Sequence, residues 1–293
     1  MTHNILKLMV LGIAMIMVSC GDDNTTSDNQ LNLNLSGLES LGSDYAYEGW
    51  IMVDGSPKTT GVFTVDSDGN ASETSFEVAA EDLEKATAFI LTIEPSPDAD
   101  PAPSAVHILA GDFSADNATL TVSHSAAIGT DFTEATGKYI LATPTDGMDN
   151  NEDSGVWFLD NSSGSPEAGL SIPALPEGWA YEGWAVIDGT PMTTGTFTSA
   201  SGSDSASTFS GSAGGPPYPG EDFIQNAPAG LTFPTNLQGA TIVVSVEPVP
   251  DNSPAPFALK PLVGMTAANA ELHTVLDMAN NAVATNPTGT ASK

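Results

Sequence analysis

The sequence predicts an all-β protein, made of two tandem antiparallel β-sandwich repeats behind a signal peptide and a flexible tether. The first observation is a duplication, because residues 46–64 (AYEGWIMVDGSPKTTGVFT) return as residues 180–198 (AYEGWAVIDGTPMTTGTFT). The second is the hydrophobic period, which is two in runs rich in aromatic and β-branched residues that end at Asp-Gly turns. The residues that recur are mainly aromatic, Gly, Pro and Thr, which indicate strands and turns rather than chemistry.

Residues 1–19 have the pattern of a lipoprotein signal peptide. An apolar run at residues 8–18 is about half of the roughly 20 residues that a membrane-spanning helix needs. Residues 17–21 (MVSCG) resemble a bacterial lipobox, which implies cleavage before Cys20 and acylation of its thiol. The alternative is an ordinary signal peptide in which this cysteine, the only one in the chain, is incidental.

Residues 20–40 are acidic and polar, and we interpret them as a tether with too little apolar content to fold. The acidic patch at residues 21–24 (GDDN) resembles the surface-export tag of some outer-membrane lipoproteins. We therefore expect a protein that is lipid-anchored to the bacterial envelope, at the outer membrane, either facing the periplasm or exposed at the surface.

The charge of the chain excludes whole classes of partner. Six Lys, no Arg and 37 acidic residues give a net charge of −31. Nucleic acid needs Lys and Arg to neutralise its phosphates, so we expect no nucleic-acid partner. Phosphorylated ligands are disfavoured for the same reason, since the Arg fork that binds them is absent.

The first repeat is predicted at residues 41–160. It is expected to begin with a hairpin at residues 50–65, a short strand at 75–78 and one helical turn at 80–87. A buried apolar strand at residues 88–93 follows, then two more strands at 106–110 and 118–123, and a closing hairpin of residues 138–143 with 156–159.

The second repeat is predicted at residues 178–280, after a linker rich in Ser, Gly and Pro at residues 161–177. The hairpin returns at residues 181–198 and the buried strand at residues 240–246. Residues 281–293 are small and polar, and we expect them to be disordered.

Each repeat resembles the C-terminal, extracytoplasmic domain of anti-sigma-K factors. The resemblance rests on the Tyr-x-Gly-Trp opening at residues 47–50 and 181–184, the Gly-x-Phe strand, and an Ala/Val-rich strand that ends in Glu-Pro. It implies an extracytoplasmic β-sandwich that senses or binds a partner. In the family, a transmembrane helix joins this domain to a part that holds a sigma factor. The sequence shows neither, so we expect no direct sigma-factor contact.

Two sets of repeated side chains are candidates for function. Tyr47 and Trp50, and their counterparts Tyr181 and Trp184, could form platforms for a ligand; the alternative is that they fill the core. Glu94 and Glu247 end the two buried strands, where they could be catalytic carboxylates or could accept backbone N–H groups. We favour the structural interpretation of both sets.

The loop at residues 146–153 is the one candidate metal site. Its acidic residues are Asp146, Asp149, Glu152 and Asp153. Oxygen ligands at this density suit Ca²⁺, but the spacing misses the EF-hand pattern, and an unbound acidic loop is the alternative. Apart from this possible calcium site and the covalent lipid, the sequence indicates no cofactor.

No catalytic constellation is evident, because the histidines lack metal-ligand spacing and no nucleophile elbow is present. The sequence therefore predicts a non-catalytic envelope lipoprotein that senses or binds an envelope protein or a glycan. The alternative is a structural or adhesive surface protein with weak calcium-binding loops.

Overall fold

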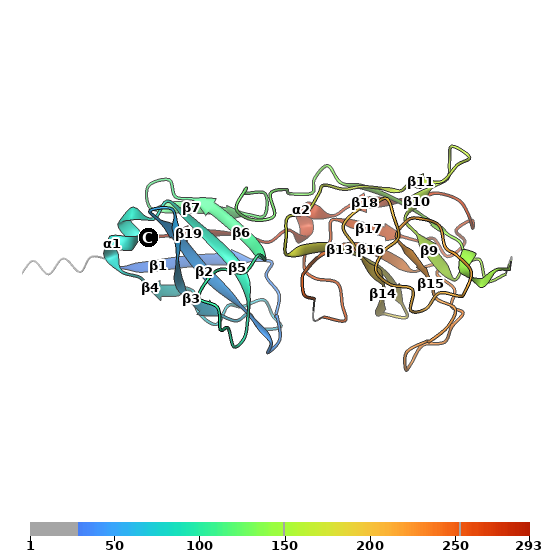
Figure 1. Cartoon of the computed structure of the whole chain (residues 1–293), viewed down its shortest axis with the longest axis horizontal. Helices are drawn as coiled ribbons and strands as arrows, with labels where there is room; N and C mark the ends of the chain where they lie inside the picture. The colour runs from blue at the N-terminus through green and yellow to red at the C-terminus, as the bar shows by residue number, and fades with distance from the viewer. Residues whose placement is uncertain (1–28, 149, 252) are drawn as a thin grey trace, which may run out of the picture.

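Two antiparallel sheets, arranged end to end along the long axis of the molecule, contain nearly all of its secondary structure (Figure 1). The structure is a computed structural model that describes residues 29–293 except residues 149 and 252. In these residues the helices are α1 (Ala80–Lys85), α2 (Ala282–Thr285) and a 3-10 turn at Pro144–Asp146. The all-β prediction is confirmed. None of the described helices combines the length and the apolar character that a membrane span requires.

The first sheet has the strand order β3-β2-β5-β6-β7-β19-β1-β4. Its strands are β1 (Gln30–Ser36), β2 (Tyr45–Val53), β3 (Ser56–Phe63), β4 (Ser75–Glu77), β5 (Ala88–Pro95), β6 (His107–Asp112), β7 (Asn117–Thr121) and β19 (Thr288–Ser292).

The second sheet has the order β14-β13-β16-β17-β18-β8-β9-β15, with β12 paired to β8. Its strands are β8 (Thr136–Leu141), β9 (Gly155–Trp157), β12 (Leu170–Ser171), β13 (Trp179–Ile187), β14 (Thr190–Phe197), β15 (Gly220–Asp222), β16 (Thr241–Pro248), β17 (Leu262–Met265) and β18 (Leu276–Asn280). A separate two-stranded ladder joins β10 (Leu159–Asp160) to β11 (Glu167–Ala168). In each large sheet the first and last strands approach each other, which gives a barrel-like sandwich.

The duplicated sequence forms the same hairpin twice, β2-β3 and β13-β14. At its tip, Asp54 and Gly55 have φ of 51° and 77°, and Asp188 and Gly189 have φ of 49° and 81°. Two successive residues with positive φ are typical of the type I′ turn, whose twist matches that of the paired strands.

A register shift interrupts both hairpins between the Gly and the Trp of the repeated motif. A Cβ on Gly183 would lie 2.5 Å from the Phe158 ring, so this position accepts only glycine. The tyrosine two residues before each glycine points into the core, and its hydroxyl donates to a backbone carbonyl eight residues upstream. Tyr47 donates to Glu39, and Tyr181 donates to Pro173.

The two repeats exchange one strand. In sheet order, β8 occupies in the second sheet the place that β19 occupies in the first. The chain leaves the first sheet after β7 and enters the second with β8; after β18 it returns to the first sheet as β19. We call β8 and β19 the exchanged strands. They share the pair Thr136-Gly137 and Thr288-Gly289 at corresponding register positions.

The structure therefore differs from the expected boundaries at four places. Residues 161–177, expected as a linker, contain β11 and β12, which pair with β10 and β8. Residues 281–293 do not form a disordered tail, because they contain α2 and β19, which pairs on both sides with β1 and β7. Residues 30–36, expected in the tether, form β1, while residues 20–28 lie outside the described part of the chain. The closing hairpin at residues 138–159 pairs as expected, but it belongs to the second sheet.

One continuous hydrophobic core runs through both sheets. At the junction, the Phe132 ring meets the Tyr181 ring edge-on at 6.4 Å. Gly178, with φ of 87°, comes so close to the backbone of the first repeat that a Cβ would lie 2.7 Å from the Ala105 carbonyl oxygen. The side-chain amide of Asn280 donates to the carbonyls of Phe132 and Ala135. The two sheets are thus packed together.

Candidate functional site

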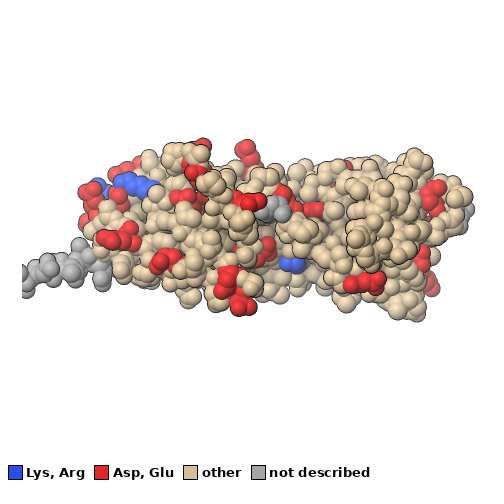
Figure 2. Space-filling model, turned by 90° about the horizontal axis from the view of Figure 1, so that it is seen from below, with Lys and Arg blue, Asp and Glu red and all other residues tan. Residues whose placement is uncertain are grey.

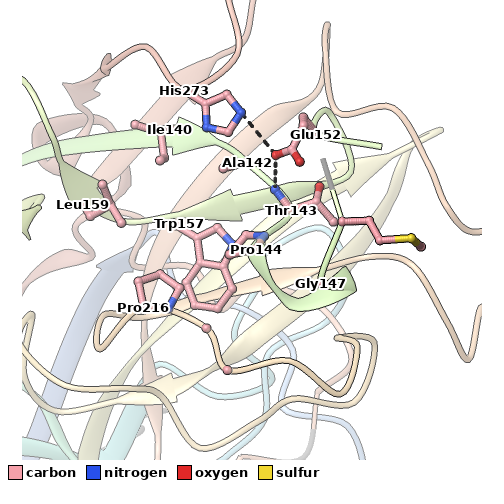
Figure 3. A pocket seen from close by; sticks show the side chains of 13 residues that line it. Ile140, Ala142, Thr143, Pro144, Gly147, Glu152, Trp157, Leu159, Pro216 and His273 are labelled. Atoms are coloured by element: carbon pink, nitrogen blue, oxygen red, sulfur yellow. Dashed lines mark hydrogen bonds and ion pairs between the residues drawn. The ribbon is translucent and has the colours of Figure 1, made fainter. Parts of the chain in front are cut away.

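An open groove of about 590 Å³ lies on the second sheet (Figure 3). Its floor follows from strand alternation: Tyr139 and Leu141 of β8 point into the core, so Ile140 and Ala142 point out. Trp157 and Leu159 join them in a small apolar cluster outside the main core.

Glycine allows a loop to close over this cluster. A Cβ on Gly215 would lie 2.4 Å from the Trp157 ring, so the loop can approach only with glycine at this position. Pro216 and Gly214 line the same side of the groove. Trp157 is only 5 % exposed as a result, so little of its ring is accessible from the groove.

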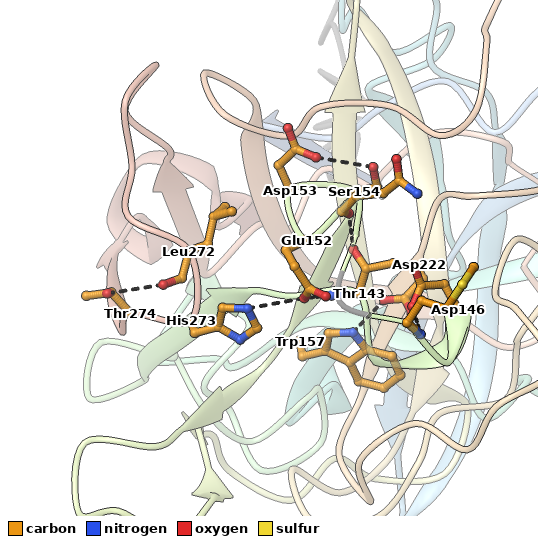
Figure 4. Close-up of polar contacts among 12 residues, drawn as sticks. Thr143, Asp146, Glu152, Asp153, Ser154, Trp157, Asp222, Leu272, His273 and Thr274 are labelled. Carbon is orange, nitrogen blue, oxygen red and sulfur yellow. Dashed lines mark hydrogen bonds and ion pairs between the residues drawn. The ribbon is translucent and has the colours of Figure 1, made fainter.

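Asp222 fixes the position of Trp157 (Figure 4). Its carboxylate accepts the indole N–H of Trp157 at 2.8 Å and the backbone N–H of Thr145 at 2.7 Å. Asp222 is fully buried on β15, and this burial raises its pKa. The carboxylate therefore joins the groove floor to the start of the loop at residues 144–153.

The rim of the groove is polar. The Glu152 carboxylate lies 3.2 Å from the His273 ring and accepts the backbone N–H of Thr143 at 3.1 Å (Figure 3). Met148 also lines the groove, and 65 % of its surface is exposed. An apolar floor with a few polar groups at its edge is typical of a ligand-binding groove.

The acidic loop contributes to this rim without gathering its carboxylates. Asp146 accepts the N–H of Met148, Glu152 faces His273, and Asp153 lies beside Ser154, so the three point to different partners (Figure 4). Asp149 lies outside the described residues. Among the residues that the structure describes, this loop forms no group of three potential metal ligands.

The repeated aromatic residues lie in the interior. Tyr47 and Tyr181 are fully buried, and Trp50 and Trp184 are 3 % and 2 % exposed. Each tryptophan donates its indole N–H to a hydroxyl on the neighbouring strand, that of Thr92 or Ser245. None of the four offers a ring face to a ligand, in agreement with the core interpretation.

Glu94 and Glu247 accept backbone N–H groups, as the structural interpretation predicts. Ser104 donates to both oxygens of Glu94, and Phe257 donates to Oε1 of Glu247 at 2.9 Å. Among the described residues, however, Glu247 also belongs to the group of three carboxylates close enough to share a metal ion, with Glu182 and Asp251. Burial raises the pKa of Glu182 to about 7 and that of Glu247 to about 8.

The sequence did not point to Glu182 or to the groove over Trp157, which we call the Trp157 groove. The sequence signal for Glu182 is its recurrence: the motif AYEGW places a glutamate in the middle of a buried strand in both repeats, at Glu48 and Glu182. The groove has no such signal, because it is formed by residues from four segments that are separate in the sequence.

Comparison with known protein families gives a match over the first repeat. Residues 23–107 match the family model described as anti-sigma-K factor rskA, C-terminal. The described part of this segment begins at residue 29 and runs from β1 through β5 to the start of β6. No match was found among curated proteins or among solved structures.

Proposed function

We propose that this protein is a non-catalytic envelope lipoprotein whose two anti-sigma-K-like domains bind or sense a partner outside the cytoplasm. The match of residues 23–107 to the anti-sigma-K C-terminal family carries this proposal, because it indicates an anti-sigma-factor-like regulatory domain. The duplicated motifs and the corresponding strand orders support a second domain of the same kind. The lipobox-like residues 17–21 support lipidation at Cys20.

The Trp157 groove is the proposed place of contact, and its partner is a protein segment with an apolar side chain. A glycan would need an exposed ring face, but Trp157 is almost wholly covered. The groove instead offers aliphatic side chains, Ile140 and Leu159, and the exposed, adaptable Met148. The chain has 37 acidic and six basic residues, and on the face that Figure 2 shows the acidic side chains gather mainly over the first repeat; this excess of negative charge favours a neutral or basic partner.

Capture from intact cells with a chemical cross-linker tests this proposal. We expect Met148→Asp to reduce the captured partner by about tenfold or more, because it places a charge in the apolar contact. Met265→Asp is the matched control: Met265 is 74 % exposed on β17 and does not line the groove. Cys20→Ser should move the protein from the membrane to the soluble fraction.

Equal capture by the wild type and the Met148 variant would contradict binding in the groove. A Cys20→Ser protein that stays in the membrane fraction would contradict the lipid anchor independently. Loss of capture in both methionine variants would indicate that general acidity, rather than the groove, governs the association.

A further inference from the structure

The second sheet brings three carboxylates together at one end. Glu182 on β13 is paired with Ser245 on β16, so Glu247, two residues beyond Ser245, lies on the same face of the sheet. Asp251 comes from the loop that follows β16. One oxygen from each of Glu182, Glu247 and Asp251 lies within 4.8 Å of the others.

Within the part of the chain that the structure describes, two of these carboxylates each keep a buried oxygen without a partner. Glu182 is 5 % exposed; its Oε1 accepts the Thr193 hydroxyl and its Oε2 accepts nothing. Glu247 is 1 % exposed; its Oε1 accepts from Ser245 and Phe257, and its Oε2 again accepts nothing. A buried carboxylate oxygen without a donor is costly, and a bound cation is one of the few groups that removes this cost.

The lysines that the structure describes do not fill the space between the three carboxylates. The nearby Lys260 uses its ammonium group to donate to the Phe257 carbonyl at 2.6 Å. The ion pairs found in the described chain join other residues, so none involves the three carboxylates.

The first repeat contains the same three acids in a different arrangement. Glu48, Glu94 and Asp98 correspond in sequence to Glu182, Glu247 and Asp251. Both oxygens of Glu94 accept the N–H of Ser104, and no oxygen of Glu48 or Glu94 is among the buried unpartnered atoms of the described residues. In the first repeat both oxygens of Glu94 therefore have a partner, and this repeat serves as a natural control for the second.

We propose that Glu182, Glu247 and Asp251 bind a calcium ion. The donors are all carboxylate oxygens, which suit a hard divalent cation. Asp251 is exposed, so the site opens to solvent on that side and water can supply the remaining ligands that calcium requires. The inference does not depend on the proposed function, because it rests only on this site.

Calcium at this position would brace the junction between the repeats. Pro248, Val249 and Pro250, between Glu247 and Asp251, line a small apolar cavity of about 110 Å³ together with Leu41 and Val106 of the first repeat. An ion bound by Glu247 and Asp251 would fix the position of both ends of residues 248–250.

Binding is measured on the full chain in detergent, by calorimetric titration with CaCl₂ and by luminescence of Tb³⁺ as a calcium substitute. Trp184 should sensitise Tb³⁺, because its indole donates to Ser245, whose hydroxyl donates to Glu247. We expect a dissociation constant on the order of 10⁻⁴–10⁻³ M, the range of weak extracellular sites, and a melting temperature that rises with calcium.

The variants locate the ion. Asp251→Asn should weaken binding by about tenfold or more, and Glu182→Gln with Glu247→Gln should abolish it, since calcium affinity depends on ligand charge. Asp251 is exposed, so its variant should keep the fold, which circular dichroism checks. Asp98→Asn and Asp146→Asn remove the same charge elsewhere and should leave the affinity unchanged.

Absence of binding by the wild-type chain would overturn the proposal and indicate that protons alone neutralise the buried carboxylates. Unchanged affinity in Asp251→Asn, or an equal loss in Asp98→Asn, would overturn it as well. A loss in Asp146→Asn alone would place the calcium at the acidic loop instead. Tighter binding of Mg²⁺ than of Ca²⁺ would overturn the choice of ion.

Discussion

Buried carboxylates are the residues that set this chain apart from an ordinary β-sandwich. Asp222 and Glu221 are consecutive residues of β15, and both are fully buried. The Asp222 carboxylate accepts hydrogen bonds from Trp157 and Thr145 and so fixes the floor of the groove. Glu39 and Asp204 are partly buried, and desolvation raises the pKa of each to about 7. In a chain with a net charge of −31, each buried acid that ionises adds to a repulsion already present.

This burial predicts that stability falls as the pH rises. Glu39 and Asp204 have an ordinary pKa near 4 in the unfolded chain and about 7 in the folded one, so the folded state holds more protons between these values. Their contribution is fully present below pH 4 and is lost as the pH rises through 7. Urea unfolding at pH 5 to 8, with EDTA present, should show a decreasing free energy of unfolding.

The matched variant for this pH dependence is Asp204→Asn, which keeps an oxygen to accept the N–H of Gly220. Its free energy of unfolding should fall less steeply over the same range, because one of the groups that releases a proton is gone. A profile as steep as that of the wild type would show that Asp204 does not titrate in this window.

At the scale of elements, the hairpins were predictable and the exchanged strands were not. The Asp-Gly turns and the Tyr-x-Gly-Trp motif locate β2-β3 and β13-β14 because turn chemistry is local. In β19, by contrast, every residue is small or polar, and only Ala291 is buried. Such a strand shows no hydrophobic period in its sequence. The core side chains at this place come from the neighbouring strands, as Leu33 of β1 and Leu120 of β7. The three-carboxylate site was equally hidden, because Glu182 and Asp251 are far apart in sequence.

Removal of β19 should therefore damage the far end of the molecule. A chain that stops at Asn286 leaves β1 and β7 without their shared partner, so the first sheet should lose its protection against limited proteolysis. A synthetic peptide of residues 287–293 added in trans should restore that protection. Lys293→Ala is the milder control, because it leaves β19 in place and removes the contacts of one ammonium group, which donates to the carbonyls of Leu83 and Ala86 and lies over the Phe113 ring.

An unchanged digestion pattern of residues 30–121 in the truncated chain would contradict the exchange. The removed segment follows α2, which itself follows β18 of the second sheet in the sequence. Faster digestion of the second sheet alone would therefore contradict the exchange too.

For the whole molecule, the exchange makes two sequence repeats into one folding unit. The chain crosses between the sheets after β7 and again after β18, and a single apolar core spans the junction. Tandem repeats joined only by a linker would be free to unfold one after the other. Here neither sheet has its full set of strands without the other half of the chain.

Calorimetry should accordingly record one unfolding transition, with equal calorimetric and van't Hoff enthalpies. The physical reason is that opening either sheet releases a strand that the other half of the chain supplies. Two resolved transitions, each with the enthalpy of about half of the chain, would contradict this coupling.

The position of β19 in the sequence also determines when the first sheet can close during protein synthesis. A ribosome makes the first sheet's other strands early but makes β19 only after the whole second repeat. At roughly 5–20 residues per second, that interval is on the order of ten seconds or more. During it the nascent N-terminal half lacks the strand that joins β7 to β1, so it cannot close. The first sheet therefore closes only after the second repeat has been made, and the N-terminal half stays open until then.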